Sequence, residues 1–293
     1  MYKKTIEDRF LNIFIYMTMI FAAVIVIIPL FSVVSMSLVS GRELAEKGIV
    51  IFPQDIDFQA YKNLFAEGSV LINGFIITLF RIVVGTAVNL LCSYVVAYAL
   101  ARRDLPGRSA LTMFFFFTML FGGGLIPTYI VVKSTGLINN IWVYILPGII
   151  SVWNMLLIRN FIMNIPVSLF ESAEIDGAGN FRIIFQLVLP LSVPALVTIG
   201  MFYAVAHWNS WWDAYLYTSK PDLQPIQLVL RNILAMANIQ ISAATASLSA
   251  DLKVPSRALQ NAAVVVTTLP IVIIYPFLQK YFIKGIMVGA VKG

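Results

Sequence analysis

Long runs of apolar residues follow one another along the chain, interrupted by few charges. The first run, Ile13 to Phe31, is continuous in hydrophobicity, and a window of about 19 residues finds five more runs. Because a hydrocarbon core about 30 Å thick takes roughly 20 helical residues to cross, each run is long enough to span a membrane. The expected spans lie at about residues 11–36, 71–101, 109–132, 141–163, 191–217 and 261–283.

The continuity of these runs decides the fold class. Strands of a membrane barrel would alternate in polarity over about 10 residues, whereas helices satisfy their own backbone groups. The pattern predicts an all-α, polytopic membrane protein with six transmembrane helices in a single domain, residues 1–293. Two conspicuous polar stretches, residues 38–70 and 218–260, separate the spans.

Composition excludes an ordinary soluble domain: 60% of residues are hydrophobic, 12% are charged, and the mean hydropathy is +0.88. The first run is too long for a signal-peptide core and lacks a small-residue cleavage site, so we expect it to remain as a span. The single cysteine, Cys92, lies inside the second span. It excludes an intramolecular disulfide and a cysteine metal cluster.

Lys and Arg are denser in the segments that lie inside if the N-terminus is cytosolic. This bias predicts cytosolic N- and C-termini, external loops at residues 38–70 and 218–260, and a cytosolic loop at residues 164–190. The net charge of +6 reflects this topology and does not indicate a nucleic-acid partner.

The cytosolic loop concentrates acidic residues in a chain that has few of them. Glu171, Glu174 and Asp176 lie within six positions of one another. Ser168 and Glu171 have the spacing of a capping box, which predicts the start of a short helix. Gly177 and Gly179 predict its end, because glycine adopts the left-handed conformation without steric cost.

The sequence after this helix predicts the start of the next one. Asn180 is placed to cap a second segment, and Pro190 and Pro194 suit the opening turn of the fifth span. The acidic helix itself has two interpretations. It is either a connector at the headgroups, which the anionic cytosolic leaflet disfavours, or a docking element for a basic protein partner. The residues alone leave both open.

The same loop resembles the signature of the permease subunits of type I ABC importers for sugars, "EAA---G---------I-LP". Glu171, Gly177 and Pro190 match it at the required spacing. Ser172 and Leu187 are its two mild departures. The resemblance implies that this loop is a coupling helix seated on an ATPase subunit. The implied coupling residues are Glu171, Ser172, Ala173, Asp176, Gly177, Leu189 and Pro190.

The resemblance extends over nearly the whole chain and implies the type I ABC importer permease fold. The ending "KGIMVGAVKG" is similar to the cytosolic tail (residues 284–293) of the second permease of maltose importers. This likeness implies that Lys284, Gly285, Lys292 and Gly293 lie at the ATPase interface. Middle segments such as "GGGLIPTYIVVKSTGLINN" are most similar to the subgroup serving complex oligosaccharides, including alginate- and pectin-derived ones.

The resemblance also implies partners in the bacterial cytoplasmic (inner) membrane. They are a second, homologous permease, two ATPase subunits that hold ATP and Mg, an extracytoplasmic solute-binding protein and membrane lipid. No phosphate-binding loop G-x-x-x-x-G-K-[ST] occurs in this chain, so we expect it to hold no cofactor and no metal. No candidate nucleophile or acid–base pair indicates an enzyme.

Aromatic residues gather near the outer end of the fifth span. Trp208, Trp211, Trp212 and Tyr215 have the spacing of one helix face. They form either an interfacial aromatic belt or a wall on which sugars stack, with Asn209 and Asp213 offering hydrogen bonds to hydroxyl groups. The lone histidine, His207, is expected to be a polar packing residue.

Two further features bear on the membrane interior. Arg81 lies in the second span, where we expect its side chain to extend to the interface in preference to binding substrate. The sequence "FGGGLIPTY", which ends at Tyr129, predicts a distortion of the third span. Whether that distortion is only a kink or also places Tyr129 on the substrate path stays open.

These observations predict the transmembrane subunit of an ATP-driven oligosaccharide importer that works by alternating access. The alternative is an ion-driven secondary carrier for a small polar solute. Such carriers usually keep ionisable relays in the membrane and inverted repeats, and only Arg81, Asp213 and His207 qualify as relay candidates here.

Overall fold

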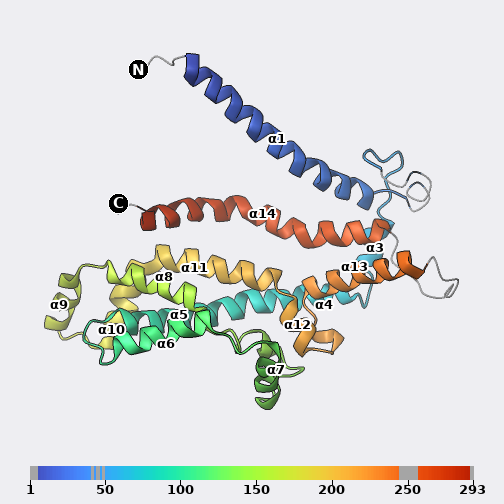
Figure 1. Ribbon diagram of the computed structural model, residues 1–293. Helices are drawn as coiled ribbons and strands as arrows, with labels where there is room; N and C mark the ends of the chain where they lie inside the picture. Colours follow the sequence, from blue (N-terminus) through green and yellow to red (C-terminus); the bar gives the residue numbers. More distant parts are fainter. Residues whose placement is uncertain (1–5, 41–42, 44–46, 48–49, 244–256, 291–293) are drawn as a thin grey trace. The chain divides into compact units, whose positions relative to one another are not determined.

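The computed structural model describes residues 6–40, 43, 47, 50–243 and 257–290, and these residues are almost all helical or in short connections (Figure 1). The only strand-like pairing among them is an isolated bridge between Val39 and Ile56. The chain forms two compact units. One comprises Met1–Ser69 with Leu230–Pro270, and the other comprises Val70–Val229 with Ile271–Gly293.

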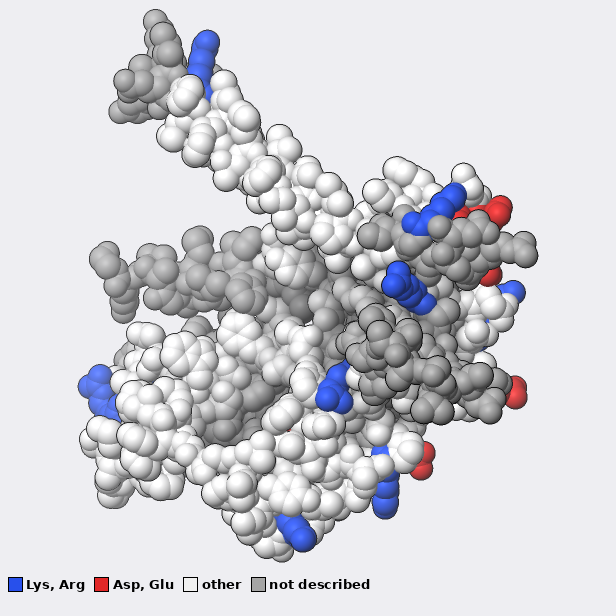
Figure 2. Space-filling model, turned by 45° about the vertical axis from the view of Figure 1, so that its right-hand side comes forward, with Lys and Arg blue, Asp and Glu red and all other residues white. Residues whose placement is uncertain are grey.

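Four helices are long and apolar enough to cross a membrane, and the number rises to six if each of two bent pairs is one span. Most of the surface in view in Figure 2 carries neither basic nor acidic side chains. Both observations agree with the predicted all-helical membrane protein.

The first unit begins with α1 (Ile6–Ser37) and contains the short helix α3 (Gln59–Leu64). The hydroxyl groups of Ser37 and Tyr61 lie 2.7 Å apart and tie the end of α1 to α3. Between them, the Glu43 carboxylate accepts hydrogen bonds from the Lys47 ammonium group and the Gln54 amide. The Lys47 hydrogen bond is the main cause that lowers the pKa of Glu43. The polar stretch is therefore locally structured.

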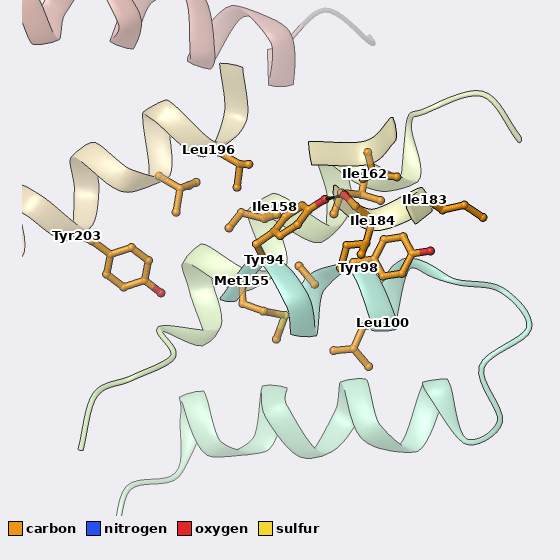
Figure 3. Packing of buried hydrophobic residues seen from close by; sticks show 13 residues of the cluster. Tyr94, Tyr98, Leu100, Met155, Ile158, Ile162, Ile183, Ile184, Leu196 and Tyr203 are labelled. Atoms are coloured by element: carbon orange, nitrogen blue, oxygen red, sulfur yellow. Dashed lines mark hydrogen bonds between the residues drawn. The ribbon is translucent and has the colours of Figure 1, made fainter. Parts of the chain in front are cut away.

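The second unit is built around one long helix, Val70–Ala101. It consists of α4 (Val70–Phe80), a π-helical segment η1 (Arg81–Gly85) and α5 (Thr86–Ala101). Its second half, α5, packs against α8 (Val152–Met163) and α11 (Leu189–Asn209). Figure 3 shows this core, in which the Tyr94 hydroxyl group donates to the Ile184 carbonyl.

The third span is broken in its middle. α6 (Arg108–Leu120) and α7 (Leu125–Ser134) meet at an angle of 114°. Gly124, the last of three consecutive glycines, has φ +84°, a conformation that other residues rarely adopt. The predicted distortion is confirmed, but the prediction of one span over 109–132 understated it.

The fourth span is shorter than predicted, because residues 141–151 are not α-helical. A single 3₁₀ turn, η2 (Ile141–Tyr144), precedes an irregular segment, and α8 starts only at Val152. The Asn89 side chain on α5 donates to the carbonyls of Gly148 and Ile149, both at 2.8 Å. A side chain from a neighbouring helix thus satisfies the carbonyl groups of this segment. Without such a partner, the segment would have to form its own helical hydrogen bonds.

The fifth span was predicted at 191–217 but occupies Asn180–Asn209. It contains α10 (Asn180–Arg182), the π-helical segment η3 (Ile183–Val188) and α11, followed by a separate α12 (Trp212–Tyr217). Pro190 and Pro194 therefore lie inside a helix and not in its opening turn. The π-helical segment η3 ends two residues before Pro190. Its wider turn accommodates the loss of the backbone hydrogen bond that proline cannot donate.

The remaining elements are the 3₁₀ turn η4 (Pro221–Leu223), α13 (Ile226–Ala243) and α14 (Arg257–Ala290). α13 lies within the polar stretch at 218–260. α14 covers the predicted sixth span.

The second and fifth spans approach each other closely at Gly85. A Cβ atom there would lie 2.6 Å from Nε2 of His207, which is itself held at 3.0 Å by the Asn89 side-chain oxygen. His207 is buried, which confirms it as a polar packing residue. Only glycine fits between these two helices without moving that hydrogen bond.

We therefore expect Gly85→Ala to lower stability by about 1–3 kcal/mol, the usual cost of overpacking a tight interior. The measurement is the thermal unfolding midpoint of the purified protein in detergent. Gly200→Ala is the matched control, because a Cβ atom there meets Leu90 at an ordinary 3.4 Å. Equal midpoints for the two variants would contradict the prediction.

Candidate functional site

The acidic loop forms a short helix, α9 (Val167–Ile175), that bends away from α8 by 73° (Figure 1). The predicted capping box is wrong. The helix begins one residue before Ser168, and the residue at its cap is Pro166, with no side-chain cap hydrogen bond. Proline sets the start because the segment "IP" before the helix favours extended backbone.

The end of α9 is fixed by Gly177, which has φ +74°. The Gly177 amide donates to the Glu174 carbonyl at 3.0 Å, and the Ala178 amide donates to the Ala173 carbonyl at 2.9 Å. This pair of bonds is the Schellman motif, which needs the left-handed conformation at its glycine. Gly177 is confirmed as the terminator of the helix.

The other two residues predicted to shape this turn act differently. Gly179 has φ −71° and ψ 166°, which is extended backbone, and it occupies the cap position of α10. Asn180 was predicted as that cap but is the first residue inside α10. Gly179 thus starts the following helix instead of ending α9.

The two faces of α9 differ in character. Phe170 and Ala173 pack against the core formed by α5, α8, η3 and α11. Elsewhere on its surface, Glu171, Ser172 and Asp176 are exposed, and Ile175 is 86% exposed. A helix held by one apolar side while it presents carboxylates and a large apolar side chain outward is suited to contact with another protein.

The three carboxylates of the loop are not equivalent. Glu174 Oε1 lies 3.1 Å from Nη1 of Arg102, at the end of α5. For Glu171 and Asp176, no ion pair forms with any of the described residues. Arg102 also donates two 2.8 Å bonds to Asp104. These bonds lower the pKa of Asp104 to about 2, so the pair stays charged at neutral pH.

The end of the motif lies on the same core. Leu189 is half-buried against it, and Pro190 is exposed on the fifth span. A pocket of about 320 Å³ opens beside the helix, lined by Phe170, Glu171 and Glu174 together with the end of α5. The motif residues thus form one connected region around α9.

A second polar cluster lies at the other end of the long helix. Arg81 is 1% exposed, so the prediction that its side chain extends to the interface is wrong. Its Nη2 atom lies 2.5 Å from Oδ2 of Asp213, and its guanidinium carbon lies 4.3 Å from the centre of the Tyr144 ring. The buried arginine is held by a carboxylate and an aromatic face, and both offset the cost of burying its charge.

Asp213 is fully engaged in this cluster. Its Oδ1 atom accepts from the Ser210 hydroxyl at 2.8 Å, the Ala214 amide at 2.9 Å and Arg81 at 3.3 Å. These bonds cross the break between α11 and α12. The structure thus gives Asp213 a structural role at the break, and its place on the substrate path stays a prediction.

Comparisons with known proteins decide the family. The family model described as "Binding-protein-dependent transport system inner membrane component" matches residues 95–288, which is more than half of the chain. The chain belongs to this family. It is an inner-membrane permease and not an enzyme.

Relatives and solved structures agree with this assignment. The permease is 38% identical over 287 residues to the polygalacturonan/rhamnogalacturonan transport system permease protein YtcP of Bacillus subtilis (strain 168), covering 98% of this chain and 100% of that one. It is 39% identical over 269 residues to protein LplC of the same strain, covering 92% and 90%. A chain of a bacterial ABC transporter involved in the import of the acidic polysaccharide alginate superposes with a TM-score of 0.85 at 28% identity, over 96% of this chain and 100% of that one.

The aromatic residues of the permease do not share one helix face, contrary to the prediction. α11 ends at Asn209, so Trp208 is buried on one helix while Trp212 and Tyr215 are exposed on another. Trp211 lies at the break, 5.4 Å from the ring of Trp212. The spacing in sequence was misleading because the helix breaks at Ser210.

Two other candidates for the substrate path have local partners. The Asn209 side chain donates to the Val205 carbonyl at 2.9 Å, and the ring of Tyr129 stacks on that of Tyr217 at 5.9 Å. All seven candidates remain predicted path residues: Tyr129, Trp208, Asn209, Trp211, Trp212, Asp213 and Tyr215. Of the tail, Lys284 and Gly285 fall in α14, and Lys292 and Gly293 lie outside the described residues.

The Arg81–Asp213 pair should dominate the stability of the part of the second unit around the break between α11 and α12. Asp213→Asn leaves Arg81 buried without a counter-charge and should cost up to about 3 kcal/mol, near the lower limit for buried pairs because the Asp213 side chain is 26% exposed. The measurement is the thermal unfolding midpoint in detergent.

Two variants complete this test. The exposed Asp222 serves as control, and Asp222→Asn should leave the midpoint unchanged. Removing both charges in Arg81→Met/Asp213→Asn should recover part of the loss. A double variant less stable than Asp213→Asn alone would refute the view that an unpaired buried charge causes the damage.

Proposed function

We propose that the permease is one transmembrane subunit of an ATP-driven importer for oligosaccharides released from acidic polysaccharides. The support is twofold. The relative that matches the whole chain is named for polygalacturonan and rhamnogalacturonan transport, and the structural neighbour imports alginate. Both polymers are rich in uronic acids, whereas galactooligosaccharides appear only in the name of a relative at 30% identity.

The observation that carries the coupling role is the geometry of α9. The helix is held by its apolar side and by Glu174, while Glu171 stays exposed and, among the described residues, forms no ion pair. A free carboxylate near the start of an exposed helix suits a basic groove on a partner. We assign Glu171 to a charge-paired contact with an ATPase subunit and Ala173 to close packing under the helix.

The proposed mechanism is alternating access. Closure of two ATPase subunits around ATP and Mg moves α9, and the membrane helices transmit that motion to the path. The free energy comes from the difference in affinity of ATP for the two states, as any such coupling requires. The chain itself supplies no nucleotide site.

The proposed assembly follows the predicted topology. Both termini and α9 face the cytosol, and the stretches at 38–70 and 218–260 face outward to receive a solute-binding protein. A second, homologous permease encloses the path with this chain, and residues 1–293 act as one domain within lipid. The tail from Lys284 reaches the ATPase interface.

The ion-driven carrier is not favoured. Its relay would need titratable groups free to exchange ions, yet Arg81 and Asp213 neutralise one another and His207 is bonded to Asn89.

The role of α9 is tested by Gly177→Val. A β-branched residue is strained at φ +74°, so the turn that ends the helix should be lost and the exposed face displaced. We expect sugar-stimulated ATPase activity of the purified transporter to fall at least about tenfold, with weaker co-purification of the ATPase, since misplacing a docking element costs at least about 1.4 kcal/mol.

Gly179→Val is the matched control for this variant. Gly179 has equally open surroundings, but its φ is −71°, which valine adopts freely. The ATPase activity of the transporter with Gly179→Val should therefore be near that of the native protein. Normal uptake by Gly177→Val would overturn the assignment of α9.

The substrate class is tested separately in proteoliposomes that contain the whole transporter and its binding protein. Oligogalacturonides or alginate oligosaccharides should stimulate ATP hydrolysis several-fold more than neutral galactooligosaccharides of equal length. Stimulation by the neutral sugars alone would contradict the acidic class while leaving the coupling role of α9 untouched.

A further inference from the structure

The cytosolic end of α5 is a meeting point for arginine side chains. The Leu100 carbonyl, in the last turn of α5, accepts from Nε of Arg108 at 2.9 Å and from Nε of Arg159 at 3.0 Å. Arg102 occupies the position that follows the helix. Cationic donors at a helix C-terminus satisfy its free carbonyls and complement its dipole. The end of α5 is thereby tied to α6 and α8.

Arg102 extends this set of ties to α9. Its Nε and Nη2 atoms both donate to Asp104 at 2.8 Å, one to each carboxylate oxygen. A two-point contact of this kind fixes the plane of a guanidinium group, which a single charge contact does not. With the plane fixed, Nη1 is directed at Glu174 on α9, 3.1 Å away.

The chain itself does not join α9 to the second span. α9 is connected through residues 164–166 to α8 and through residues 176–179 to α10. Its apolar contacts with the core, through Phe170 and Ala173, are non-directional. The ion pair from Arg102 to Glu174 is directional and sets one orientation.

We propose that Arg102 is a positioning residue for coupling. It holds α9 in a fixed orientation on the end of α5, so that displacement of α9 moves the second span as well as its chain neighbours. Glu174 then belongs to the permease's own joint with α5, in contrast to Glu171 on the partner face. This proposal rests on the proposed coupling role of α9.

The test is a double-mutant cycle of Arg102→Gln and Glu174→Gln in the complete transporter, purified from native membranes and placed in proteoliposomes. The readout is the ratio of sugar-stimulated to basal ATPase activity, together with the amount of ATPase that co-purifies. Each single variant should lower the ratio about two- to fivefold, as expected for a partly exposed pair, with unchanged co-purification.

If the two residues act as one contact, the double variant should be no worse than either single one. Arg103→Gln is the matched control. Arg103 is the neighbouring arginine, lines the same pocket and is exposed, so its ratio should not change.

Three outcomes would overturn the proposal. In the first, the losses in the activity ratio of the two single variants multiply in the double variant. In the second, neither single variant changes the ratio. In the third, Glu174→Gln no longer co-purifies with the ATPase, which would place Glu174 at the partner interface. Failure of the proposed coupling role looks different, because Gly177→Val would then retain both the ATPase and sugar stimulation.

Discussion

Backbone groups within a membrane cannot turn to water for hydrogen bonds, and this constraint decides where the helices of the permease break. At several of the breaks, side chains supply hydrogen-bond partners for the backbone. Asn89 bonds the two carbonyls before α8, and Arg81 and Asp213 bond the backbone on both sides of the break after α11. The Thr128 hydroxyl bonds the Gly124 carbonyl at the sharp bend between α6 and α7. Polar residues inside the spans thus hold irregular backbone in place.

Each of the two π-helical segments lies next to a residue that perturbs a long helix. η1 starts at Arg81, so the wider turn coincides with the residue that forms the ion pair. η3 ends two residues before Pro190, and its wider turn accommodates the loss of the backbone hydrogen bond that proline cannot donate. Both segments leave the long helices continuous while they change the direction of side chains, which is a common use of such turns at functional sites.

The helix α9 is stabilised in a different way. α9 is exposed, so it needs no internal partner for its outer face, and its stability comes from its apolar side, the Gly177 turn and the bond from Arg102.

The sequence by itself determined the membrane class, the first, second and sixth spans and the short helix in the acidic loop, because hydrophobic length and local turn residues are local properties. It also identified Gly177, whose conformation depends only on its own turn. It did not reveal that Arg81 and Asp213 meet, because they are 132 positions apart and only packing of the second span on the fifth brings them together. For the same reason it treated Trp208 to Tyr215 as one helix face, and it grouped Glu174 with Glu171. Only tertiary structure decided these points, since the partners that break a helix or hold a charge come from distant parts of the chain.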